Sequence, residues 1–91
     1  MNAASLHPDN GARMVIERAS VDESGARYVV RVYEPEGVLH EGEASCGEEV
    51  TLRLDAPEWT KTFLERLLKS LRNKHREDGD WPRKLTRWRH P

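Results

Sequence analysis

Residues 49–71 read EVTLRLDAPEWTKTFLERLLKSL, and their hydrophobic period changes near the middle. Before Asp55, apolar and polar residues alternate, which places Val50, Leu52 and Leu54 on one face of a strand. After Asp55, apolar residues recur every three or four positions, as they do along one face of an amphipathic helix. A strand is therefore expected to lead directly into a helix. The apolar members of the helical stripe are Trp59, Phe63, Leu64, Leu67, Leu68 and Leu71.

The start of this helix carries several sequence signals at once. Asp55 is expected to be the N-cap, because Glu58 follows three residues later as in a capping box. Pro57 falls in the first turn, where its missing N–H is tolerated. Gly79 is placed to end the last turn. The pattern predicts a helix over residues 56–76.

Upstream of residue 49, the chain reads as three more strands joined by short turns. The strongest is residues 26–34, where Tyr28, Val30 and Val32 share one face. The run that precedes it begins at residue 13 and is separated from it by the turn chemistry of residues 22–25. A weaker strand follows over residues 38–45, and Gly42 within it suggests a β-bulge.

These elements predict an α+β fold: a four-stranded antiparallel β-meander (residues 13–54) with one C-terminal amphipathic α-helix packed on one face, in the order ββββα. The expected organisation is a flexible N-terminal lead (1–12), a single domain (13–78) and a basic, tryptophan-containing C-terminal tail (79–91). A chain of 91 residues suits one compact core.

Composition narrows the function classes. The single cysteine, Cys46, excludes an internal disulfide and fits a reducing compartment, so we expect a cytoplasmic protein with no membrane span and no secretory signal. The histidines and Cys46 match no spaced zinc pattern, and no phosphate loop or catalytic triad motif is present. We therefore expect no metal, no cofactor and no enzymatic activity.

Charge is divided unevenly along the chain. Residues 1–65 hold six Lys/Arg and thirteen Asp/Glu, whereas residues 66–91 hold nine Lys/Arg and three Asp/Glu. The formal net charge of −1 thus conceals an acidic part followed by a basic part. Such asymmetry indicates an electrostatic partner for the basic part.

The basic helix end and tail form the candidate binding site. Cations neutralise phosphates and an indole stacks on unpaired bases, so this composition favours single-stranded nucleic acid. The predicted nucleic-acid-binding residues are Arg72, Arg76, Arg83, Lys84, Arg87, Trp88 and Arg89.

Other interpretations of the same segment remain open. Trp81 and Trp88 would serve a structural tail if they fold back onto the core, and the cations would equally fit an acidic protein surface, including that of a second copy. Exposed indoles beside a contiguous cationic surface favour nucleic acid, whereas buried indoles favour the structural interpretation. The alternative function is a protein-interaction or self-association module, with a homodimer formed through a sheet edge, through the uncovered sheet face or through the complementary charged parts.

Overall fold

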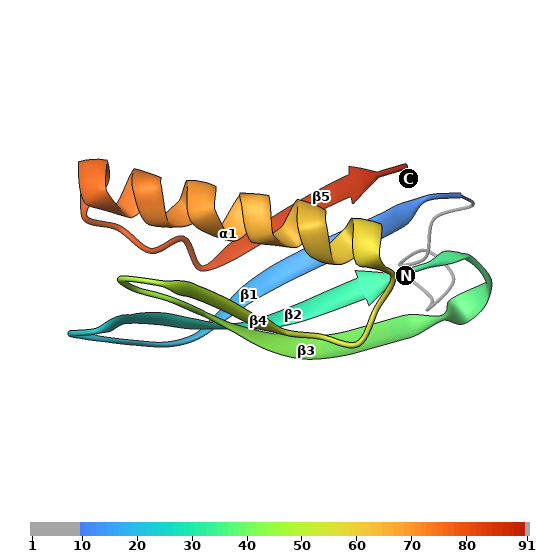
Figure 1. Cartoon of the computed structure of the whole chain (residues 1–91), viewed down its shortest axis with the longest axis horizontal. Helices are drawn as coiled ribbons and strands as arrows, with labels where there is room; N and C mark the ends of the chain where they lie inside the picture. Colours follow the sequence, from blue (N-terminus) through green and yellow to red (C-terminus); the bar gives the residue numbers. More distant parts are fainter. Residues whose placement is uncertain (1–9, 91) are drawn as a thin grey trace.

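A computed structural model describes residues 10–90 of the chain, and Figure 1 shows one antiparallel sheet with one helix lying across it. The sheet has five strands in the spatial order β4-β3-β2-β1-β5, and the molecule measures 39 × 28 × 19 Å. The elements are β1 (Ala12–Asp22), β2 (Gly25–Tyr33), a short 3-10 turn η2 (Pro35–Gly37), β3 (Leu39–Cys46), β4 (Val50–Arg53), α1 (Glu58–Asp78) and β5 (Lys84–Arg89).

The α+β class, the four-stranded meander and the covering helix are confirmed, but the sheet has one more strand than predicted. The additional strand, β5, comes from the predicted tail. After β4, helix α1 crosses back over the sheet, and β5 then pairs antiparallel with β1 at the edge opposite β4 (Figure 1). Pairing satisfies backbone groups of β1 that would otherwise form an open edge. Residues 84–89 therefore belong to the domain and do not form a separate tail.

The core lies between α1 and the sheet face that it covers. Strand register places every second residue on this face, and Tyr28, Val30 and Val32 of β2 are buried as predicted. Leu64, Leu68 and Leu71 of α1 pack against them. Leu85 of β5 and Trp81 of the preceding loop are partly buried against the same cluster, so the C-terminal segment contributes to the core.

Helix α1 starts and ends later than the sequence predicted. Pro57 is its N-cap, with no side-chain hydrogen bond to the helix end, so the capping box expected from Asp55 is wrong. Instead, the Thr60 hydroxyl donates to the Pro57 carbonyl at 2.6 Å. At the other end, Gly79 adopts φ 77° and its N–H donates to the His75 carbonyl, as its position indicated.

Gly42 does not mark a bulge. It pairs with Val30 in an unbroken β2–β3 register, and the irregularity in the sheet lies in β1 between Arg18 and Ser20. Gly42 is required for another reason: a Cβ at this position would collide with the Arg53 carbonyl oxygen. The glycine thus permits the chain leaving β4 to pass close over β3.

Two sequence predictions concern the ends of the chain and the membrane. The predicted lead (1–12) falls largely outside the described residues, although Ala12 is already part of β1. Among residues 10–90, no helix is both long and apolar enough to cross a membrane.

Candidate nucleic-acid interface

The register between β5 and β1 decides which way the basic side chains of β5 face. Arg89 pairs with Ala12 and Arg87 with Met14, both of which are buried under α1. Arg87 and Arg89 therefore lie on the face of β5 that is turned toward α1. Because β5 is an edge strand, they also lie at the edge of the sheet. The Arg89 guanidinium lies over the Phe63 ring, 4.9 Å from the ring centroid, which ties the end of β5 to the N-terminal half of α1.

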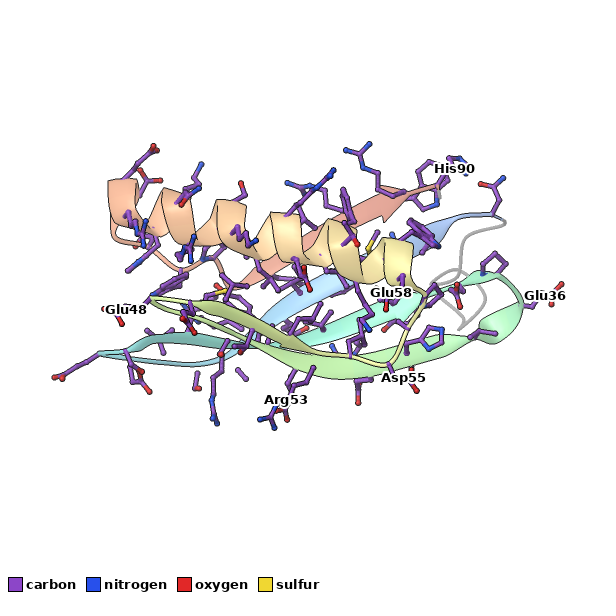
Figure 2. The ribbon with its side chains drawn as sticks, in the orientation of Figure 1. Glu36, Glu48, Arg53, Asp55, Glu58 and His90 are labelled. Atoms are coloured by element: carbon purple, nitrogen blue, oxygen red, sulfur yellow. The ribbon has the colours of Figure 1, made fainter. Side chains whose placement is uncertain are left out.

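A groove runs between the N-terminal half of α1 and the C-terminal end of β5. Its volume is about 620 Å³, within the usual range for small-ligand sites. Figure 2 places His90 at the end of β5, beside the helix-facing side of the sheet. Among residues 10–90, no lining residue is acidic, so the described part of the groove presents cationic, aromatic and hydroxyl groups to a negatively charged ligand. The lining residues are Trp59, Thr62, Phe63, Arg66, Arg89 and His90.

Exposed cations continue from this groove along both elements. Phe63 faces β5, and helical periodicity carries the same flank of α1 through residues 67 and 70 to Lys74. Arg66 lines the groove itself. We call the four exposed cations Arg66, Lys74, Arg87 and Arg89 the β5-side surface.

Trp88 points to the opposite face of the sheet. It pairs with Arg13, whose neighbours Ala12 and Met14 are the residues that face the helix. The indole is 49% exposed, and its Nε1 donates to the Asn10 carbonyl at 3.2 Å. Trp88 is therefore accessible, on the strand face opposite Arg87 and Arg89, and its ring meets the His90 ring edge-on with 4.3 Å between centroids.

Trp81 has a structural position. Its ring stacks on His75 of α1, with 4.0 Å between centroids, and its carbonyl accepts a hydrogen bond from the Arg18 guanidinium at 2.9 Å. The next residue, Pro82, accepts a hydrogen bond from the Tyr28 hydroxyl at 3.0 Å. Trp81 thus fits the structural interpretation, because it holds the chain against α1. Trp88 is exposed, as the nucleic-acid interpretation expected.

The remaining predicted site residues lie elsewhere. Arg72 and Arg76 line a cleft of about 430 Å³ at the C-terminal end of α1, and its other walls include the acidic side chains of Asp22, Glu23 and Glu48. The Arg72 guanidinium donates to the Glu48 carbonyl at 3.1 Å. Arg72 and Arg76 therefore lie beside the turns that join β1 to β2 and β3 to β4, and they are not part of the β5-side surface.

Arg83 and Lys84 lie at the start of β5. The Arg83 carbonyl accepts a hydrogen bond from the Arg18 N–H at 2.7 Å, and Lys84 pairs across the sheet with Glu17. Of the seven predicted residues, the structure therefore brings only Arg89 into the groove lining, and Arg87 lies on the same face of β5 outside that lining.

The uncovered face of the sheet carries several residues of opposite charge on neighbouring strands. Arg31 of β2 donates to the Glu41 carboxylate at 2.8 Å, and Glu17 lies 3.7 Å from the same guanidinium. Glu43 pairs with Arg53, which points away from α1 in Figure 2. Arg31 is therefore held between two carboxylates on this face, and Glu43 and Arg53 are cross-strand neighbours of opposite charge.

The two groups whose pKa values are raised by burial lie under the helix and not in the groove. Burial raises the pKa of the Cys46 thiol to about 11, and burial also raises the pKa of the Tyr28 hydroxyl to about 12. Cys46 is therefore a protonated core residue at neutral pH, without the activation that a nucleophile needs. Within residues 10–90, no three His, Cys, Asp or Glu side chains come close enough together to hold a metal ion.

The sequence did not single out the groove residues of α1. Trp59 and Phe63 were assigned to the apolar stripe that covers the sheet, yet the fully buried positions are Thr60, Leu64 and Leu68. Trp59 and Phe63 lie on the flank of that stripe and remain partly exposed. One sequence feature could have indicated them: the apolar stripe is wider than the part of the helix that covers the sheet. Trp59 and Phe63 lie at its margin, next to Arg66.

Comparison of the chain with protein-family models, curated proteins and solved structures found no significant match.

Proposed function

We propose that this protein is a small non-enzymatic module that binds single-stranded nucleic acid through its β5-side surface. The observation that supports this function best is the groove between α1 and β5, where Arg66 and Arg89 stand beside aromatic rings and none of the described lining residues is acidic. Single-stranded nucleic-acid sites combine cations that follow the phosphate backbone with aromatic platforms for the bases.

Electrostatics would restrict binding to this side of the molecule. The net charge is −1, and acidic side chains are concentrated in residues 1–65, which form β1 to β4 and the first part of α1. A polyanion would be repelled by these acidic side chains and attracted by the four cations of the β5-side surface. If all four contact phosphates, log K for a single strand falls with log[salt] at a slope of roughly −3.

Self-association through the free edge of β5 is the less favourable alternative. This strand lies at the edge of the sheet and reads KLTRWR. Antiparallel pairing with the same strand of a second copy would bring the positive charges of the two strands together, and such charges normally protect an edge from pairing. The same charges suit an anionic ligand.

The decisive experiment is fluorescence-anisotropy titration with a labelled 12-nucleotide single strand and its duplex, at several salt concentrations. The test variant carries Lys74→Gln and Arg87→Gln on the β5-side surface. The control variant carries Arg27→Gln and Arg53→Gln on exposed positions of the uncovered sheet face, so both variants lose two positive charges. Both are checked for folding by circular dichroism.

Salt-sensitive binding that weakens about tenfold or more in the test variant, and much less in the control, would support the proposal. Absence of binding at low salt would overturn it. Equal weakening in both variants would also contradict it, because the effect would then follow total charge and not this surface. Binding of labelled poly-glutamate without binding of either oligonucleotide would favour an acidic protein partner.

A further inference from the structure

We infer that the groove between α1 and β5 takes an unpaired nucleobase, so that the protein recognises single strands by their bases as well as by their phosphates. This inference rests on the proposed function and adds the ligand group that the groove would hold.

The first support is the position of Arg89. Its guanidinium lies 4.9 Å from the Phe63 centroid, and Arg89 is nevertheless exposed. A planar guanidinium held on an aromatic ring is a stacking surface, because bases stack on arginine planes as well as on aromatic rings. The contact with Phe63 holds this group beside the groove before any ligand arrives, which reduces the ordering cost of binding.

The second support is the nature of the walls. Trp59 and Phe63 are only partly buried against the core, so each keeps part of its ring at the groove. A free base edge requires hydrogen-bonding groups as well, and the Thr62 hydroxyl and the His90 imidazole are in the lining. The groove thus provides ring faces together with polar groups, as base-binding pockets do.

The third support is the placement of the surrounding charges. Arg66 lies in the groove, and Arg87 and Lys74 are exposed outside it. A base seated between α1 and β5 would leave its own phosphate and the neighbouring phosphates at the rim, within the field of these cations. A duplex, whose bases are stacked and paired, would have to give up that pairing to fill the groove.

The test compares two charge-matched ligands: an eight-nucleotide thymidine strand and an otherwise identical strand whose central residues are abasic tetrahydrofuran units. Both present the same phosphates, so only base contacts distinguish them. The wild-type protein is expected to bind the thymidine strand about five- to tenfold more tightly, as the loss of one stacked base implies. Tryptophan fluorescence should be quenched by the thymidine strand and much less by the abasic strand, and Trp59→Phe should remove most of that difference.

Two conservative variants locate the effect. Arg89→Lys keeps the positive charge and removes the planar group, so it should reduce binding of the thymidine strand several-fold more than binding of the abasic strand. Arg87→Lys makes the same change on the same strand face, outside the groove lining, and should keep the preference for bases.

Equal affinity for both strands in the wild-type protein would overturn the inference while leaving the proposed phosphate binding intact. Loss of the base preference in Arg87→Lys but not in Arg89→Lys would also overturn it. If neither strand binds at low salt, both the inference and the proposed function fail.

Discussion

The Trp81 indole stacks on the His75 imidazole, with 4.0 Å between the ring centroids and 13° between the ring planes. This contact joins the loop before β5 to the last turns of α1. It is reinforced by the bond from Arg18 to the Trp81 carbonyl and by the bond from Tyr28 to the Pro82 carbonyl. These contacts join α1, β1 and β2 to the loop through which the chain passes from α1 into β5.

Trp81→Ala is expected to destabilise the fold. The substitution removes a partly buried indole and its stacking contact with His75. We expect a loss of about 2–3 kcal/mol in the free energy of unfolding. Urea unfolding followed by circular dichroism measures this loss. The control is Trp88→Ala: its indole is 49% exposed, so the loss should be smaller, about 1 kcal/mol or less. Equal losses would contradict a structural role specific to Trp81.

Removal of β5 should destabilise the whole domain. A chain ending after Pro82 retains the Trp81 contact but loses Leu85 from the core and the ladder between β5 and β1. We expect a loss of about 3 kcal/mol or more, together with concentration-dependent aggregation through the uncovered edge of β1.

A chain ending after Arg89 is the control for this truncation, because it keeps the entire strand and should unfold like the full chain. Thermal melts and sedimentation velocity distinguish the two. Unchanged stability of the shorter chain would mean that β5 is not part of the cooperative fold in solution.

The strands and the helix were predictable because their apolar residues repeat with a clear period. β5 was not, because its inward-facing positions after Leu85 are Arg87 and Arg89, so the usual alternation of apolar and polar residues is lost. Arg89 takes such a position by lying across Phe63 at the edge of the core, where its charged end remains exposed. A charged edge strand of this kind looks like a tail in the sequence.

The candidate site was predictable in composition but not in geometry. The sequence showed that cations gather after residue 65, yet their grouping depends on the register of β5 against β1. That register places Arg87 and Arg89 on one face and Trp88 on the other. Likewise, the Arg72 contact with the Glu48 carbonyl depends on where α1 meets the turn between β3 and β4. Both relationships are long-range and leave no local pattern.

Gly42→Ala should be costly although glycine is usually a poor strand residue. The added methyl group would meet the Arg53 carbonyl oxygen, so β3 and the chain leaving β4 must move apart. Overpacking of this kind is expected to cost about 1–3 kcal/mol. Gly37→Ala is the comparison, because its Cβ would meet no atom within 4 Å and only its φ of 80° opposes the change. Chemical unfolding of both variants tests the difference, and a neutral Gly42→Ala would contradict the close approach.

The stability of the fold should fall at alkaline pH. Burial raises the pKa of Cys46 from 9.0 to about 11 and that of Tyr28 from 10.0 to about 12, so the folded state favours the neutral form of both groups. Their contribution is complete below pH 9 and is lost as pH rises through 11 and 12, since the unfolded chain then releases these protons more readily. Urea unfolding at intervals between pH 7 and 12 should show a plateau to about pH 9 followed by a decline. Cys46→Ala removes one of the two groups and should make the decline shallower, relative to its own stability at pH 7. A wild-type stability that stays level to pH 11 would contradict the burial of both groups.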